Sequence, residues 1–567
     1  MKRILLSISL TLLALSAGAQ DMYDALPFAQ NNYYGTARSV ALGNAVTALG
    51  GDLGMVGINP AGSAVNDFWQ FSITPALLFQ STDTRWSADG SENFGSPYRT
   101  SHTKFNVPNC GLNIVFYSDD DQSVLKYVTT GFVVNTVNTY LDYSYAHGSN
   151  NRTSYLGNLA GGVLGSSPDV WNDRLYTAYL GGQISEFGPD GSCRYSGANQ
   201  MVAPSEAYAY VPGELSQSSE LVRYGSMSDV IMNIGFNMSD KFYFGFNLGL
   251  PVSTFNRVDS FSETAGSPVA FPVNLLDKDG KHIGREGEPT TYYKSSFSEF
   301  RLVSQVSGIY GKFGFIWLPV AGLRVGAAIQ SPSFLTVDES YKYTTTTTYE
   351  DKKYDGKDEY RDGDIYNLRT PYKVNAGIAY ALGVNGLLSV DYEMADYSVM
   401  KFSDPEVNFI NSGGSDWMSW ENRRMKQFLG VSHSLRAGLE IKPTPELAVR
   451  AGYGFITSQE RYATDARTGY MVYAESWAGP DQELKDFRYF NDVTHSFSLG
   501  LGYYSHGSFF ADAAVRLTKY PASPIAPYYF ADYDVFDKDG KLLDVGMPYY
   551  TRDRRIVDLL LTIGWRF

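Results

Sequence analysis

The end of the chain alternates between large apolar residues and smaller or polar ones. Every second residue up to the last is large and apolar: Leu559, Leu561, Ile563, Trp565 and Phe567. The positions between them carry Asp558, Leu560, Thr562, Gly564 and Arg566. This period of two indicates a β-strand with one apolar face and one mostly polar face. The sequence therefore predicts that the chain ends in a sheet that is apolar on one side.

The same division recurs upstream. Segments 372–382, 434–441, 447–455 and 508–518 each place apolar residues on one face and small, polar or charged residues on the other. One such strand also fits a half-buried soluble sheet, but many in succession favour a membrane barrel with a polar lumen. The expected lumen face carries charges of both signs: Lys373, Asp391, Glu393, Arg436, Glu440, Arg450, Asp512, Arg516 and Asp558. Mixed charges predict ion pairs with a segment of the chain that plugs the lumen. A path for charged solutes is less favoured, because it would need a ring of side chains with the same sign of charge.

The lengths of the connections also favour a barrel. We count about fourteen strands, an even number as in single-chain bacterial barrels. Their expected spans are 68–79, 104–117, 125–145, 226–237, 241–254, 297–317, 322–346, 369–382, 386–401, 433–442, 446–457, 493–504, 508–520 and 555–567. Connections after even-numbered strands are short, whereas those after odd-numbered strands are long, as in outer-membrane barrels. The predicted fold is all-β, a transmembrane antiparallel β-barrel over residues 68–567.

The amino terminus indicates export. Lys2 and Arg3 precede a short apolar run at 4–15, and Ala17-Gly18-Ala19 forms an A-x-A cleavage site. This order predicts a signal peptide at residues 1–19. No later stretch approaches the ~18 apolar residues that a membrane helix needs. The chain is therefore expected in the periplasm, outside the cell or in the cell outer membrane, and the strand pattern favours the outer membrane.

Residues 20–67 precede the first strand and do not alternate. Small residues dominate between Gly35 and Gly62, so this backbone can pack tightly in a confined space. Asn59-Pro60 predicts a turn or a helix start, because Pro suits the first helical position and keeps the preceding residue extended. A flexible leader is the alternative. Burial is favoured by the apolar residues Val40, Leu42, Val46, Leu49, Leu53, Val56 and Ile58.

The run from Gly35 to Gly62 ends in Asn59-Pro60-Ala61-Gly62 and resembles the amino-terminal hatch of the FadL family of hydrophobic-compound transporters. The resemblance is closest to the branch of Bacteroidetes-type bacteria, although Asn44 stands where relatives often have a second glycine. It implies a fourteen-stranded barrel whose lumen is plugged by a hatch at 20–67. It also implies passive uptake of small hydrophobic molecules, without ATP or a cofactor, and release through a side opening in the wall.

The long 146–225 connection carries a candidate capture surface. Segments 156–164 and 170–180 are expected to form short helices, and the second offers an apolar surface made of Trp171, Leu175, Tyr176 and Tyr179. One interpretation is a site that captures an apolar ligand from outside. The other is a loop that packs on itself.

Composition argues against several functional classes. A net charge of −14 argues against a nucleic-acid partner, because phosphates are bound by basic surfaces. The two cysteines can form neither a disulfide framework nor a thiolate metal site, and the six histidines show no metal-ligand spacing. No Ser/His/Asp arrangement stands out. We therefore expect no enzyme, no cofactor and no bound metal.

Two functions from different classes remain. The first is passive, hatch-gated uptake of small hydrophobic molecules such as long-chain fatty acids or aromatic hydrocarbons; a receptor for another apolar ligand such as haem is a variant. The second is a docking subunit of a secretion or surface-attachment complex. The expected partners are a small hydrophobic ligand, outer-membrane lipid and the barrel assembly machinery, which would read the terminal Phe567. A monomer is favoured.

Overall fold

The computed structural model describes most of residues 21–567. The segments outside the description are 1–20, 89–93, 118–122, 164–167, 186–194, 203–208, 278–280, 286, 384, 406–415, 475–476, 529–534, 537–541 and 544–547. The predicted signal peptide therefore lies outside the described residues. None of the helices in the described ranges is long and apolar enough to cross a membrane.

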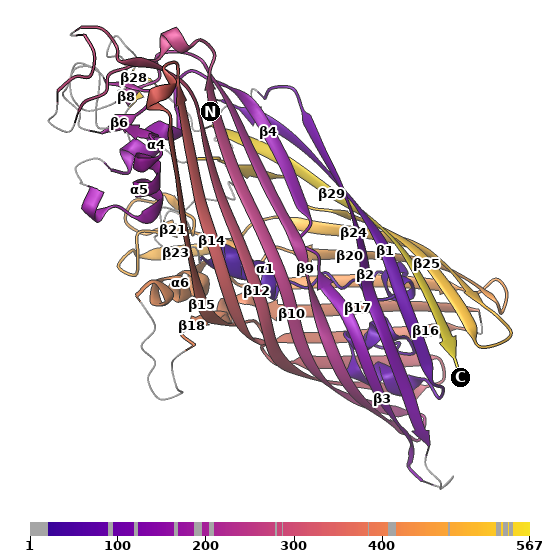
Figure 1. Ribbon diagram of the computed structural model, residues 1–567. Helices are drawn as coiled ribbons and strands as arrows, with labels where there is room; N and C mark the ends of the chain where they lie inside the picture. Colours follow the sequence, from indigo (N-terminus) through magenta and orange to yellow (C-terminus); the bar gives the residue numbers. More distant parts are fainter. Residues whose placement is uncertain are drawn as a thin grey trace.

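Within the described residues, fourteen antiparallel strands form a closed barrel (Figure 1). Strands that follow one another along the chain pair, and β1 closes the barrel against β29, from Gln70 opposite Arg566 to Ser87 opposite Tyr549. The continuous strands are β1 (Gln70–Ser87), β2 (Tyr98–Tyr117), β9 (Leu215–Met238), β10 (Phe242–Ala265), β12 (Thr291–Val320), β19 (Val431–Ile441), β20 (Leu447–Thr457), β24 (Val493–Tyr504) and β29 (Tyr549–Arg566).

The remaining barrel strands consist of two pieces each. They are β3 (Leu125–Asn138) with β4 (Asp142–Asn150), β13 (Leu323–Gln330) with β14 (Phe334–Tyr349), β15 (Gly356–Arg369) with β16 (Lys373–Leu382), β17 (Gly386–Asp396) with β18 (Lys401–Ser403), and β25 (Phe509–Lys519) with β26 (Ser523–Ile525). Every segment that the sequence assigns to a strand overlaps a barrel strand, in the predicted order. The fold prediction is therefore confirmed.

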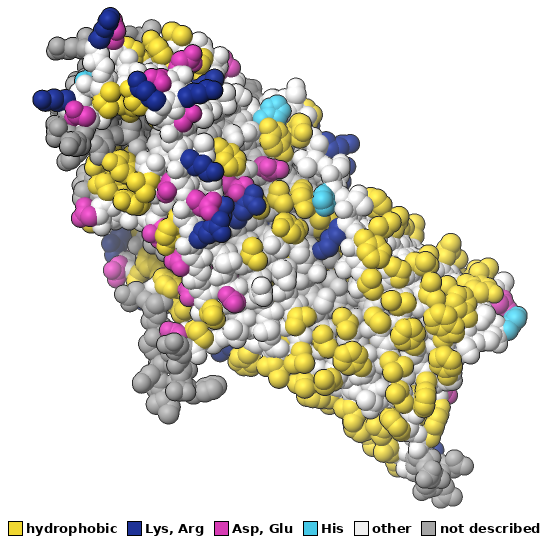
Figure 2. Space-filling view, viewed as in Figure 1, with side chains coloured by type: hydrophobic (Ala, Val, Ile, Leu, Met, Phe, Trp, Pro, Cys, Tyr) yellow, Lys and Arg dark blue, Asp and Glu magenta, His cyan; other side chains and the backbone are white. Residues whose placement is uncertain are grey.

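The two faces of the wall have the predicted character. Leu559 and Leu561 are each 44% exposed on the outside, whereas Asp558 and Thr562, which flank them, are fully buried. The charged residues predicted for the lumen face, from Lys373 to Asp558, are all buried. Figure 2 shows apolar side chains gathered over the end of the barrel that holds the short turns, with charged side chains mostly nearer the long loops. The outer surface therefore has an apolar band and a polar region beyond it.

Residues 21–66 lie inside the barrel. They form α1 (Met22–Ala29), α2 (Ala37–Ala41), α3 (Leu53–Val56) and the 3₁₀ turn η1 (Pro60–Val65), drawn in indigo in Figure 1. Each begins with a side-chain cap: Asp21, Thr36, Asp52 and Asn59 accept hydrogen bonds from backbone N–H groups of the following turn. Pro60 occupies the first position after Asn59, so the predicted Asn-Pro helix start is confirmed.

The long loops gather at one end of the barrel, away from the carboxy terminus (Figure 1). Their helices are α4 (Tyr155–Gly161), η2 (Pro168–Val170), α5 (Asp173–Leu180), η3 (Pro268–Ala270), η4 (Lys352–Tyr354), η5 (Tyr397–Val399) and α6 (Asp416–Phe428). Their short strands are β5 (Ile184–Ser185), β6 (Ser196–Gly197), β7 (Met201–Val202), β8 (Ala209–Tyr210), β11 (Pro272–Val273), β21 (Arg461–Asp465), β22 (Met471–Val472), β23 (Leu484–Tyr489), β27 (Val535–Phe536) and β28 (Leu542–Leu543). The two helices predicted in the 146–225 connection are therefore present as α4 and α5.

Candidate functional site

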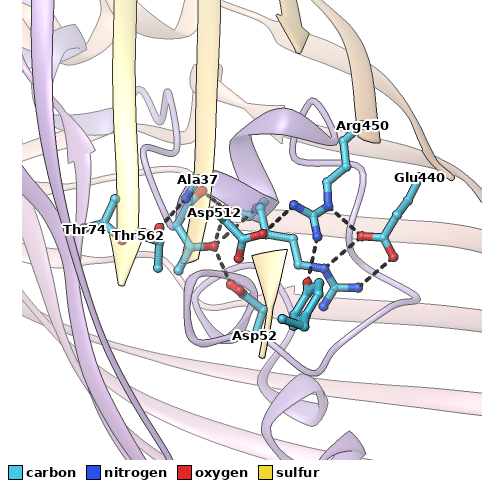
Figure 3. A network of polar contacts seen from close by, with 11 residues as sticks. Ala37, Asp52, Thr74, Glu440, Arg450, Asp512 and Thr562 are labelled. Atoms are coloured by element: carbon cyan, nitrogen blue, oxygen red, sulfur yellow. Dashed lines mark hydrogen bonds and ion pairs between the residues drawn. The ribbon is translucent and has the colours of Figure 1, made fainter. Parts of the chain in front are cut away.

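A buried ionic network ties the N-terminal segment to the barrel wall (Figure 3). Arg38 on α2 lies 3.2 Å from Glu440 on β19, and Arg450 on β20 lies 2.6 Å from the same carboxylate. Arg450 also contacts Asp512 on β25 at 2.5 Å, and its side chain is fully buried. Buried charges are tolerated only when they are paired, because water no longer solvates them. Arg38 therefore couples the segment to a network that the wall already holds together.

Hydrogen bonds fix the segment at further points. Asp391 on β17 accepts from the backbone N–H of Thr47 at 2.6 Å, and the Asn59 side chain donates to the carbonyls of Thr47 and Phe315. Thr562 on β29 accepts from the N–H of Ala37 at 2.7 Å. The contacts reach strands on several sides of the barrel, so the segment fills the lumen and is not attached to one side only.

Two wall glycines allow the segment to lie directly against the strands. A Cβ at Gly452 on β20 would overlap the backbone nitrogen of Gly43, and one at Gly326 on β13 would overlap the carbonyl of Thr47. Residues without a Cβ are therefore required where the two backbones meet.

A cavity of about 340 Å³, here called the chamber, lies between the N-terminal segment and the outer loops. Its apolar lining includes Leu26, Tyr140, Phe255, Tyr397 and Tyr520. Its polar lining includes Gln30, Asn31, Asn32, Arg223, Arg552 and Arg554. The lining is about equally apolar and polar, so the chamber can hold a small ligand that presents both kinds of surface.

Helix α1 forms part of the chamber wall and contacts an outer loop. The N–H of Met22 donates to Glu421 on α6 at 3.1 Å, and Asp24 pairs with Arg257 on β10 at 2.7 Å. Burial raises the pKa of Asp24 to about 7, although Arg257 opposes this shift, and burial also raises the pKa of Glu421. Phe28 completes the contact by meeting Phe255 edge to face. The start of the described chain therefore lies between an outer loop and the lumen wall.

The third barrel strand is interrupted beside the chamber, where the sequence predicted one continuous strand over 125–145. β3 ends at Asn138, Tyr140 adopts a left-handed backbone with φ of 47°, and β4 resumes at Asp142. The Asn138 side chain accepts from the N–H groups of Thr139 and Tyr140. Asn favours this local turn over a continued ladder, and this residue was the one sequence signal for the break.

The interruption leaves a part of the wall without a ladder, here called the seam. In the described structure β2 pairs with β3 only from Asn109 to Tyr117, and β4 pairs with β9 but not with β2. The free edge of β4 instead bonds lumen-facing side chains of β1, since the carbonyls of Tyr143 and Tyr145 accept from Gln80 and Thr84. The seam between β2 and β4 is therefore closed by side chains.

Three side chains of β2 close the seam. Lys104 donates to the carbonyl of Gly225 on β9, and the ring of His102 stacks on Tyr143 with centroids 3.9 Å apart. Tyr98 meets Tyr145 edge to face at 5.0 Å. These contacts can separate without breaking a strand pair, because no backbone hydrogen bonds cross the seam in the described residues.

The predicted outer-loop residues lie together but contribute unequally to the surface. Trp171 packs against Tyr179 at 5.5 Å, Leu175 is buried in the loop core, and Tyr176 is 43% exposed. A small cavity of about 50 Å³ between this loop and the wall is lined by other residues, among them Tyr155. The structure thus leaves Tyr176 as the member of the group most available to a ligand.

The predicted assembly residue lies at the edge of the closing strand pair. Phe567 is 72% exposed, and its backbone exchanges hydrogen bonds with Trp69, just before β1. Among the described residues, no group of three or more His, Cys, Asp or Glu side chains is arranged to hold a metal.

Comparisons with known proteins show structural likeness without close sequence likeness. No family model matches the chain, and no curated protein matches it. Similar solved structures include the toluene transporter TodX of P. putida, with 12% identity over 94% of this chain and 99% of that one, at a TM-score of 0.47. A FadL homologue of Pseudomonas aeruginosa is 13% identical over 94% and 98%, at 0.45. The Ralstonia pickettii toluene transporter TbuX is 13% identical over 94% and 99%, at 0.43.

Proposed function

We propose that this protein is an outer-membrane channel for the passive uptake of small, mainly hydrophobic molecules, with residues 20–67 acting as a hatch. The observation that carries the proposal is the position of the chamber. It lies between the N-terminal segment and the long loops, beside the seam. The chamber is lined by Asn138 to Asp142, the residues at which the third strand is interrupted, so a ligand in it lies next to the part of the wall that has no ladder.

The geometry favours release through the seam over release through the lumen. Below the chamber, residues 33–65 fill the barrel, and the Arg38–Glu440 pair holds them in place. At the seam, an opening requires the Lys104 bond, the two aromatic contacts and the hydrogen bonds between the edge of β4 and the Gln80 and Thr84 side chains to separate. An apolar ligand leaving at the Lys104 end of the seam, next to the outward-facing Phe105, would enter hydrocarbon, which solvates it better than water does.

A cross-link across the seam tests the proposal. Cys110 and Cys193 are first replaced by Ser, and His102→Cys with Tyr143→Cys is then introduced and linked with a short bifunctional thiol reagent. We expect uptake of labelled toluene or a labelled fatty acid by proteoliposomes to fall at least tenfold. A cleavable reagent should allow recovery after reduction.

A matched pair on an intact part of the wall is the control. Tyr392 on β17 and His433 on β19 also stack, with centroids 5.9 Å apart, but their strands are joined by a full ladder. Linking Tyr392→Cys to His433→Cys should leave uptake unchanged. Unaltered uptake after complete cross-linking of the seam pair would contradict release through the seam.

A further inference from the structure

The outer wall carries basic residues at the loop-side edge of its apolar band. On β25 the outward apolar positions end at Leu517 and the next outward residue is Lys519; on β29 they end at Val557 and the next is Arg555. Outward residues follow each other at roughly 7 Å along a strand. Each cation therefore lies one outward step beyond an apolar side chain.

β25, β29, β1 and β2 pair in that order, and the outward residues around Asp83 on these strands include Lys519, Arg555, Arg85 and Arg99. On β1 and β2 the cations lie further from the apolar band, because two polar outward residues separate Arg85 from Phe79 and Arg99 from Phe105. We call these four residues the basic row. Arg99 and Arg555 are 65% and 45% exposed, so their guanidinium groups are accessible from outside.

The basic row holds more positive charge than its own carboxylates balance. Asp83 lies 2.7 Å from Arg99 and 3.1 Å from Arg555, and Asp553 lies 3.4 Å from Arg555. Within the described part of the chain, the side chains of Lys519 and Arg85 form no hydrogen bond or ion pair, although Arg85 is close enough to Asp83 for electrostatic attraction. Four cations thus share two carboxylates, although the whole chain has a net charge of −14.

The register places two of the cations against each other. Lys519 lies directly opposite Arg555 in the β25–β29 ladder. Like charges in directly opposed positions destabilise a strand pair. Among the described residues, Asp83 and Asp553 contact Arg555 but form no ion pair with Lys519, so an anionic ligand beside Lys519 would reduce this repulsion.

Basic residues elsewhere on the outer wall are arranged differently. Arg301 on β12 pairs with Glu299 of its own strand, and Arg361 on β15 pairs with Glu359 in the same way. Arg301 lies one outward step from the exposed Val303, as Lys519 does from Leu517. What distinguishes Arg301 and Arg361 is that each is neutralised by a carboxylate of its own strand.

We propose that the basic row binds the phosphate groups of an outer-leaflet glycolipid of the lipid A class, whose acyl chains lie on the adjoining apolar band. This inference rests on the outer-membrane placement in the proposed function, which sets the long-loop end outside. Guanidinium groups bind phosphate through two parallel hydrogen bonds, and a phosphate monoester carries about −1.5 to −2 charges at neutral pH. That charge matches the excess of two cations over carboxylates in the row.

The test uses the full-length mature barrel in detergent and native mass spectrometry with lipid A. Lipid A is compared with the same lipid after enzymatic removal of its phosphates, and inorganic phosphate is added as a competitor. The variant is Arg85→Gln with Lys519→Gln, because neither side chain has an ion-pair partner among the described residues and the Asp83 pairs stay intact. The control is Arg301→Gln with Arg361→Gln.

We expect the variant to bind phosphorylated lipid A at least tenfold more weakly, and the control to bind it as the unaltered protein does. Dephosphorylated lipid should bind weakly to all three proteins, and inorganic phosphate should not compete at equal concentration. Equal binding of both lipids, effective competition by inorganic phosphate, or an unchanged variant would overturn the inference. The variant should keep its hydrophobic uptake, so a failure of uptake in the unaltered protein would count against the proposed function alone.

Discussion

The substitution Arg38→Ala should loosen the N-terminal segment without disturbing the wall. Arg38 is the cation that the segment contributes to the network, and it contacts Glu440 through Nε at 3.2 Å and Nη2 at 3.5 Å. When Arg38 is removed, Glu440 keeps Arg450 as its partner at 2.6 Å. Truncation of Arg450 would instead leave Asp512 buried without that partner. Arg38→Ala is therefore the more selective perturbation.

The size of the effect follows from the contacts that are lost. Hydrogen bonds to charged groups contribute about 1.5–3 kcal/mol, and the longer of the two bonds here is weak, so we expect a loss of about 2 kcal/mol in docking free energy. Each 1.4 kcal/mol corresponds to a factor of about ten. The population with an undocked segment should therefore rise about thirtyfold.

Single-channel recording in planar bilayers measures this population. We expect the frequency of ion-conducting openings to rise about thirtyfold in Arg38→Ala, and by a smaller factor in Arg38→Lys, which keeps the charge but loses the planar fork. Arg361→Ala on the outer wall serves as the control. Heat-modifiable migration on gels should show that all variants assemble. If assembled Arg38→Ala opens no more often than the unaltered barrel, the ion pair does not hold the segment.

Four further outcomes are expected. Deletion of residues 20–66 should leave a barrel that assembles but conducts polar solutes nonselectively; if it instead only strips a partner protein from the purified barrel, the docking function is favoured. Deletion of Phe567 should lower the yield of folded barrel in membrane fractions, because its backbone bonds help to close the last strand on the first. Gly452→Val should displace the segment and raise conductance, because its Cβ overlaps the segment backbone. Tyr176→Ser should weaken uptake at low ligand concentration if the loop captures ligand, and unchanged uptake would favour a loop that packs on itself. Trp171→Ser should weaken uptake and also loosen the loop, which is detected as faster proteolysis.

The strands were predictable because lipid requires every strand to have an apolar outer face. Alternation such as that of Leu559, Leu561 and Ile563 persists wherever the outer face meets hydrocarbon. The same alternation placed the charged residues correctly on the lumen face, including Arg450 and Asp558. Strand ends were harder to predict. β9 begins at Leu215, whereas the pattern indicated 226, because beyond the apolar band both faces of a strand can be polar.

The candidate site was less predictable because it depends on contacts between distant residues. The bond from Met22 to Glu421 joins residues 399 positions apart, and no local pattern marks it. Helix α6 lies in a connection that the sequence analysis left without structure, and part of its surface packs on α1. The break at Tyr140 leaves the hydrophobic pattern and the length of the 125–145 segment unchanged, so the sequence analysis did not find it. The turn-forming Asn138 was the one residue that could have indicated it.

The two closures of the chamber differ in strength, and this difference predicts that they act separately. The segment is held by the Arg38–Glu440 ion pair together with hydrogen bonds to several wall strands, whereas the seam is held by side-chain contacts, among them the aromatic contact of about 1 kcal/mol between His102 and Tyr143. A ligand in the chamber should therefore open the seam while the segment stays docked. Arg38→Ala should then raise ion conductance and retain seam-dependent uptake, whereas the seam cross-link should lower uptake and leave conductance unchanged. If either change alters both measurements to the same extent, the chamber has a single exit and the separation of the two closures is wrong.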